Sequence, residues 1–203
     1  MKLYFATGTI SIAVAVALNE AGVAYDTHQL DFAAGEQRGD DYAAINPKGR
    51  VPALDVGGTI LTETGAILEY VATLAPGLMP ADPMAAAKAR GVMYYLASTM
   101  HVAHAHGRRA NRWADKETSW ADMIAKVPQT MTECAAFVEA ECLTGPYIFG
   151  DEVCVADAYL FVVCNWLTGD GVDLAPFPKV RAFLAAMEAR TSVQAVRANG
   201  MLP

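Results

Sequence analysis

The stretch "APGLMPADP", residues 75–83, divides the chain into two parts of different character and so limits the folds that it can adopt. Before it, short apolar runs typical of strands alternate with helical patterns; after it, every long pattern is helical. The sequence therefore predicts an α/β domain over residues 1–75, a linker over 76–83 and an all-helical domain over 84–203. Hydrophobic residues make up 54% of the 203 residues, which is ample for a packed core.

The first part has a defined order of elements. Residues 2–5 predict a strand, 10–22 a helix that ends at a glycine, 24–32 a second strand and 40–49 a short helical turn. Two short strands around Gly57-Gly58 predict a hairpin, and a helix begins near Glu63. A helix between the first two strands implies a parallel pair, to which the hairpin adds antiparallel strands. In the second part, residues 84–106 predict one long helix.

Charge and composition exclude several classes of function. The net charge of −7 argues against a nucleic-acid partner, because phosphate binding needs a basic face. No apolar run reaches the roughly 18 residues of a membrane helix, and the start "MKLYFATGTI" lacks the pattern of a signal peptide. We expect a cytoplasmic protein whose four cysteines are reduced and mostly buried.

Two motifs of the first part carry chemistry. In "INPKGRVPAL", Pro52 opens a strand, and Val51-Pro52 is a candidate cis peptide. Glu63 and Thr64 stand where a helix begins, so main-chain N–H groups can bind an anion there while the carboxylate holds an ammonium group. A γ-glutamyl group carries both charges on one carbon. The alternative is ordinary capping of the helix by Thr62 or Glu63.

The whole arrangement resembles the cytosolic glutathione transferase family, above all its bacterial members, which share the "MKLY" opening and "AINPKG-x-VPAL" followed by "LTE-x-x-AI". The resemblance implies a thioredoxin-like first domain that binds glutathione as co-substrate, an all-helical second domain with a mostly apolar site for an electrophile, and a homodimer. It implies that glutathione contacts come from Arg50, Val51, Pro52, Glu63 and Thr64, with Pro52 in the cis form.

The stretch "YFATGTISIAV", residues 4–14, would then face the glutathione thiol, whose thiolate is the nucleophile. The resemblance implies a cysteine at Ile10 in the nearest bacterial class, so that residue is absent here. Ser11 is the first candidate for activating the thiol and Thr9 the second. The alternative is that these hydroxyls only cap the following helix. Because no cysteine precedes Cys134, we exclude a thiol–disulfide oxidoreductase.

The stretch "HVAHAHGRRANRW", residues 101–113, places His101, His104, Arg108 and Arg112 on one helix face. The resemblance implies that His101 lies at the glutathione pocket. His104 or Arg108 would meet a carboxylate of glutathione or an anionic co-substrate. The alternative is a solvated polar face. No metal is expected, because H-x-x-H lacks a third ligand nearby and arginines repel a cation.

Aromatic residues of the helical part are core residues by default. Two of them, Tyr94 and Trp166, are candidates for lining the co-substrate cleft between the domains.

The motif "GDEVCVADAYLFV" resembles the capping motif of the family, with Asp157 retained and Cys154 in place of its hydroxyl residue. A thiol is a poor acceptor, so this cap should be weaker than one made by serine. We assign Asp157 to folding and expect it to accept a hydrogen bond from the N–H of Cys154.

The sequence favours a transferase that conjugates the glutathione thiolate to an electrophile, or reduces peroxides, in detoxification. A non-catalytic protein of the same fold that binds glutathione or apolar ligands is the alternative, favoured by Ile10. A glutathione-dependent isomerase or lyase is the further enzymatic alternative.

Overall fold

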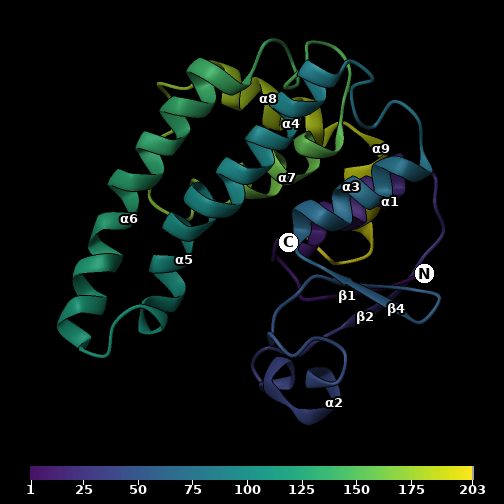
Figure 1. Cartoon of the computed structure of the whole chain (residues 1–203). Helices are drawn as coiled ribbons and strands as arrows, with labels where there is room; N and C mark the ends of the chain where they lie inside the picture. Colours follow the sequence, from purple (N-terminus) through teal and green to yellow (C-terminus); the bar gives the residue numbers. More distant parts are fainter. Residues whose placement is uncertain (203) are drawn as a thin grey trace.

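The computed structural model of the chain describes residues 1–202 and contains a four-stranded mixed sheet covered by helices (Figure 1). The strands are β1 (Lys2–Phe5), β2 (Asp26–Gln29), β3 (Ala53–Val56) and β4 (Thr59–Thr62). They lie in the order β2-β1-β3-β4, with β1 parallel to β2 and antiparallel to β3, and β3 antiparallel to β4. The predicted thioredoxin-like arrangement is confirmed.

Helices make up the second part, as predicted. The helices of the chain are α1 (Ser11–Glu20), α2 (Asp40–Ala43), α3 (Thr64–Leu74), α4 (Pro83–Tyr95), α5 (His101–Arg109), α6 (Glu117–Phe137), α7 (Val155–Asn165), α8 (Pro178–Glu188) and α9 (Thr191–Ala198). Short 3-10 turns are η1 (Glu36–Arg38) and η3 (Ala110–Arg112), and short π-helical turns are η2 (Leu96–Met100) and η4 (Val138–Cys142). The single helix predicted over 84–106 is therefore interrupted by the wider turn η2, a local geometry that apolar periodicity does not reveal.

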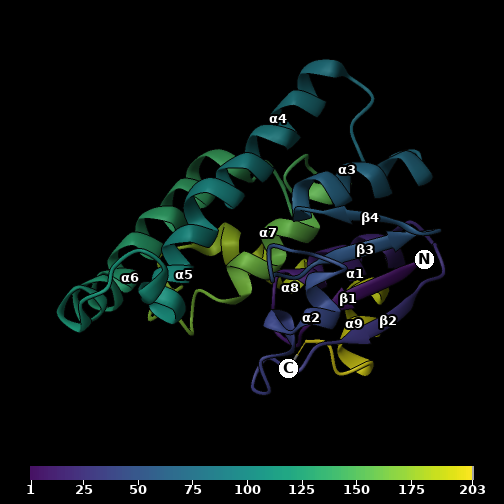
Figure 2. The ribbon, with the colours of Figure 1, turned by 60° about the horizontal axis from the view of Figure 1, so that its bottom comes forward.

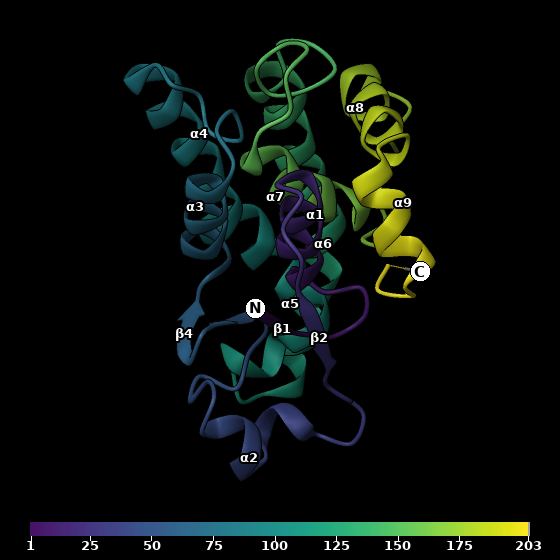
Figure 3. The same cartoon turned by 90° about the vertical axis from the view of Figure 1, so that its right-hand side faces the viewer.

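Helix α1 is the centre of the molecule. Its residues Ser11 to Leu18 are all buried, which agrees with a sequence that is apolar on every face. It packs against the sheet, against α3 and against α7 and α9 of the second part. Figure 3 shows α1 between α3 on one side and α9 on the other. One hydrophobic core thus runs through both parts of the chain.

A second, smaller cluster covers the other face of the sheet, where α2 lies (Figure 2). It contains Leu30, Tyr42 and Ala53, with Tyr4 packed against it. The hydroxyl of Tyr42 donates to the carbonyl of Arg50 over 2.8 Å. This small core therefore holds the loop that enters β3.

A half-buried ion pair joins the end of α1 to the start of α9. Arg190 donates to Glu20 through Nε and Nη2 over 2.5 and 2.8 Å, and the hydroxyl of Ser192 donates to the same carboxylate over 2.5 Å. Burial alone would raise the pKa of Glu20, but the bonds from Arg190 and Ser192 lower it below its usual value. Arg190 also reaches the hydroxyl of Tyr147 over 2.9 Å.

Helix α7 is buried along almost its whole length, and its start is fixed by Asp157. This carboxylate accepts from the N–H of Cys154 over 2.8 Å and from the N–H of Ile148 over 2.9 Å. The predicted bond to Cys154 is confirmed. All four cysteines are free and buried. No helix within residues 1–202 combines the length and the apolar character needed to cross a membrane.

We predict that Cys154→Ser raises the melting temperature measured by calorimetry. Cys154 occupies the N-cap of α7 with its side chain facing the N–H of Asp157, and a serine oxygen accepts that bond better than sulfur. A gain of about 0.5–1 kcal/mol corresponds to roughly 1–4 °C in a chain of this size. The control is Cys164→Ser, which buries a hydroxyl within α7 and should lower the melting temperature. A melting temperature that stays the same or falls in Cys154→Ser would contradict the capping argument.

Candidate functional site

The turn between β1 and α1 holds its hydroxyl groups inward. Thr9 Oγ1 donates to the carbonyl of Ala6 over 2.7 Å and lies 2.6 Å from Ser11 Oγ. Ser11 is fully buried, and its Oγ also lies 3.4 Å from the main-chain N and O of Ala6. Neither hydroxyl caps α1, so the capping alternative is not what the structure shows. Both hydroxyls instead bond within the turn, to each other and to Ala6.

The main chain at the start of α1 has N–H groups without a hydrogen-bond partner. Within residues 1–202, neither the N–H of Ile10 nor that of Ser11 donates to another group. The side chain of Ile10 is buried, so the turn presents its main chain rather than a reactive side chain. Free N–H groups at the positive end of a helix favour a negative charge.

The loop before β3 is the second component of the site. The Val51-Pro52 peptide bond, named above as a candidate cis peptide, is cis. The carbonyl of Arg50 accepts from Tyr42 and also from Asn46 Nδ2, over 2.7 Å. The N–H and C=O of Val51 bond to no other group of residues 1–202, which leaves them available to an extended peptide.

The start of α3 is the third component. Glu63 has a φ of 71°, a conformation that costs a residue other than glycine about 1–3 kcal/mol. Its carboxylate lies 2.5 Å from Lys48 Nζ, which also donates to Thr62 Oγ1 over 2.8 Å. Thr64 is buried at the first position of α3, where the helix N–H groups lack intrahelical partners. Sequence reasoning missed Lys48, although it belongs to "NPKG".

Two histidines of α5 and a tryptophan of α7's C-terminal end form an aromatic group. The ring of His104 stacks on Trp166 with centroids 4.1 Å apart, and the ring of His101 lies 5.1 Å from the same indole. Trp166 Nε1 donates to the carbonyl of Gly8 over 3.1 Å. The second part of the chain therefore contacts the turn that precedes α1. That Trp166 lines a co-substrate cleft stays a prediction.

Asp170 orients His104. Its carboxylate oxygens lie 2.8 and 3.0 Å from Nδ1 of the imidazole, and both side chains are mostly buried. Asp170 stands 66 residues away in the sequence, in a loop where no local pattern marks it. The pairing occupies Nδ1 of His104, so a substrate carboxylate could be met only through Nε2, and that expectation stays a prediction.

The basic residues of α5 are arranged differently from the predicted single face. Arg108 is exposed, whereas Arg109 turns inward and its Nη2 lies 3.5 Å from His101 Nε2. The α-helix ends at Arg109, and the 3-10 turn η3 that follows changes the direction of Arg112. Tyr94 is 62% exposed on α4, with no ring contact to Trp166. The structure thus joins His101 to Arg109 and not to Arg108 or Tyr94.

Burial lowers the pKa of His101 to about 3, with the positive charge of Arg109 and then the neighbouring His104 and Arg50 acting in the same direction. His101 is therefore neutral over the physiological range. It can accept or donate a hydrogen bond but supplies no positive charge to a ligand.

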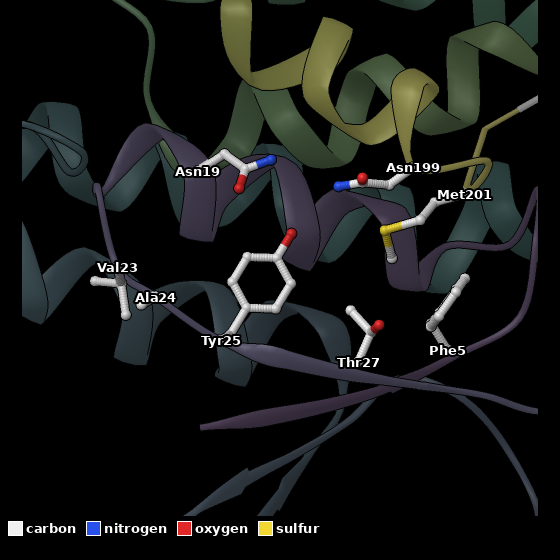
Figure 4. A pocket seen from close by; sticks show the side chains of 8 residues that line it. All are labelled: Phe5, Asn19, Val23, Ala24, Tyr25, Thr27, Asn199 and Met201. Atoms are coloured by element: carbon white, nitrogen blue, oxygen red, sulfur yellow. The ribbon is translucent and has the colours of Figure 1, made fainter.

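A cavity of about 520 Å³ lies away from these groups, between β2, the end of α1 and the C-terminal segment (Figure 4). Tyr25, Asn199 and Met201 are among its lining residues. None of the predicted site residues lines it, so the candidate site is defined by the converging polar groups rather than by this hollow.

Comparison with known proteins gives two family matches. The family described as "Glutathione S-transferase, N-terminal domain" matches residues 1–73, and "Glutathione S-transferase, C-terminal domain" matches residues 119–186. A crystal structure of a glutathione transferase homologue from Sulfitobacter, with bound glutathione, is 59% identical. It covers 99% of this chain and 98% of its own, with a TM-score of 0.97.

Two curated relatives are also similar over nearly the whole chain. Glutathione S-transferase GstA of Escherichia coli O157:H7 is 30% identical, over 99% of this chain and 100% of the relative. Maleylpyruvate isomerase of Ralstonia is 33% identical, over 92% of this chain and 91% of the relative.

We predict that His101 makes the folded state less stable in acid. Its folded pKa of about 3 lies below the unfolded value of 6.5, so the unfolded chain binds the extra proton as the pH falls from 6.5. Its contribution is fully present above pH 6.5 and falls by up to about 1.4 kcal/mol per pH unit below it. Asp157, whose pKa burial raises to about 6, acts in the opposite sense between about pH 4 and 6.

The measurement is the free energy of unfolding of each variant, obtained by denaturant titration at pH values between about 7.5 and about 4.5. His101→Gln should lose stability less steeply than the parent as the pH falls. The control is His28→Gln, which removes an exposed histidine of β2. Equal slopes in the parent and His101→Gln would contradict a neutral, buried His101.

Proposed function

The chain belongs to the glutathione S-transferase family, and we propose that it binds glutathione and transfers the glutathione thiolate to an electrophilic small molecule. One observation carries this proposal. Three main-chain sites without partners in residues 1–202 lie in the first domain: Val51, the start of α1 and the start of α3. Together they suit an extended tripeptide that carries a thiol and two carboxylates.

We assign the γ-glutamyl end to the start of α3. The carboxylate of Glu63 would hold its ammonium group, and the helix N–H groups at Thr64 would bind its carboxylate. Val51 would pair with the cysteinyl part through its N–H and C=O, and Pro52 would hold the loop beside it. The second carboxylate of glutathione needs a cation, and we assign Arg50 to it because Arg50 directly precedes Val51 in the sequence.

We propose that the main chain at Ile10 and Ser11 stabilises the thiolate, with the hydroxyls of Thr9 and Ser11 holding that turn in place. Donors at a helix N-terminus lower the pKa of a thiol, because they favour its anion. Attack on an electrophilic carbon then forms the S–C bond while the leaving group departs with its electron pair. Binding both reactants in one cleft supplies the proximity that the reaction needs.

The resemblance to the family also supports a homodimer, a cytoplasmic location and a role in detoxification, which we propose with the activity. Light scattering of the purified protein tests the homodimer. A glutathione-dependent isomerase is the second candidate, supported by the 33% identity to a relative named maleylpyruvate isomerase. The balance of glutathione separates the two reactions, because a transferase consumes one glutathione per turnover and an isomerase returns it.

We predict that Glu63→Gln weakens glutathione binding about tenfold, as measured by calorimetric titration. The change removes the charge that would hold the ammonium group, a loss of about 1.4 kcal/mol. The control is Glu69→Gln, since Glu69 lies on the same helix but pairs with Arg90 over 3.0 Å. Equal affinity in the parent and Glu63→Gln would contradict the assigned position. No binding by the parent would favour the non-catalytic alternative without glutathione.

We predict that Thr9→Val leaves the pKa of bound glutathione within about 0.5 unit of the parental value. The reason is that the Thr9 hydroxyl already donates to Ala6, and the main chain is unchanged. Ultraviolet absorbance of the thiolate against pH gives the measurement. Ser11→Ala should lower thermal stability with a similarly small effect on this pKa. A rise of about one unit in either variant would instead assign thiol activation to that hydroxyl.

A further inference from the structure

Four arginines gather beside the candidate site, and we call them the arginine cluster: Arg38, Arg50, Arg109 and Arg112. They come from η1, the loop before β3, the end of α5 and η3. Burial, followed by the charges of Arg112 and Arg50, lowers the pKa of Arg109. Burial, followed by the charges of Arg50 and Arg38, lowers the pKa of Arg112. The two domains thus bring like charges within electrostatic reach of each other.

These charges have no counter-ion in the part of the chain that the structure describes. No carboxylate of residues 1–202 pairs with any member of the arginine cluster. The chain has 22 acidic against 15 basic residues, so carboxylates are abundant elsewhere. Arg90 and Arg190, for comparison, each pair with a glutamate. The members of the arginine cluster therefore lie near one another without an ion pair to a carboxylate.

Arg109 is the member of the arginine cluster that has a buried polar atom without a partner. Its Nε is buried and has no hydrogen-bond partner within residues 1–202. Its Nη2 lies 3.5 Å from His101 Nε2, and His101 in turn lies beside Trp166. A buried N–H of a guanidinium without an acceptor is unfavourable, and a planar carboxylate can satisfy it with two parallel bonds.

Glutathione alone does not use this much positive charge. In the function proposed above, one of its carboxylates lies at the start of α3 and the other needs a single cation, such as Arg50. Arg109 and Arg112 belong to the second domain, and Arg109 lies beside His101, which contacts Trp166 where the co-substrate would lie. Their charge is therefore available to the second substrate.

We propose that the arginine cluster, through Arg109 and Arg112, binds a carboxylate of the second substrate, so that the preferred electrophiles are small carboxylic acids rather than neutral apolar molecules. This proposal rests on the proposed function and names its substrate class. An aryl chloride that carries a carboxylate is a simple substrate of this class. The glutathione sulfur bonds to the ring carbon, the carbon–chlorine bond breaks, chloride leaves with the electron pair, and the thiol proton passes to solvent.

The test compares 4-chloro-3-nitrobenzoate with 4-chloro-3-nitrobenzamide, which differ in charge and little in shape. Each kcat/KM is divided by the uncatalysed rate constant with glutathione. We expect the acid to be favoured at least about tenfold, the worth of one charge-assisted bond. Arg109→Gln should remove this preference by slowing the acid and leaving the amide within about twofold. Arg181→Gln, at an exposed arginine of α8, should retain it.

Two results of this kinetic comparison would overturn the proposal. One is a preference near unity in the parent. The other is an equal loss for both probes in Arg109→Gln together with weaker glutathione binding, since Arg109 would then serve glutathione. If Arg109→Gln fails to fold, Arg112→Gln replaces it, and a loss of preference there supports the same site.

A binding measurement keeps this proposal separate from the transferase function. Calorimetric titration with 3-nitrobenzoate, which has no leaving group at the attacked carbon, reports the anion site without turnover. Binding to the glutathione complex of the parent and not of Arg109→Gln supports the site even if neither probe reacts. No binding to the parent overturns the anion site, whether or not neutral electrophiles are conjugated.

Discussion

The enclosure of α1 is the constraint on which the rest of the structure depends. A helix that is buried from Ser11 to Leu18 cannot shift along its axis without disturbing the sheet on one side and α7 and α9 on the other. Its first turn is therefore held at a fixed place between the domains. The ion pair between Glu20 and Arg190 fixes its other end. The donors at the start of α1 owe their position to this packing and not to any side chain of the turn.

This arrangement divides the work between main chain and side chains. The groups assigned to glutathione are largely main-chain N–H and C=O groups at Val51 and at two helix starts, so they persist through changes of side chain. On this division, Ile10 can stand where the resemblance implies a cysteine without any loss to the proposed glutathione site. In our proposal, side chains such as Arg109 act on the second substrate rather than on glutathione.

Features carried by contiguous sequence could be predicted, because local patterns report them. The sheet, the loop at Pro52, the start of α3 and the bond from Asp157 to Cys154 all belong to this group. The arginine facing His101 could not be predicted, because Arg108 and Arg109 are adjacent and the choice depends on where α5 ends. The pairing of His104 with Asp170 joins distant segments, and only tertiary packing decides it.

The arginine cluster lies in a chain whose net charge is −7. At low ionic strength, where the Debye length exceeds the about 8–10 Å of physiological conditions, an approaching anion meets the overall negative charge before it reaches the arginines. Encounter with glutathione or with another acid is therefore opposed until the ligand enters the cleft, and moderate salt should ease it. The arginine cluster would then favour anions over neutral molecules by slowing their dissociation from the cleft, and not by speeding their association.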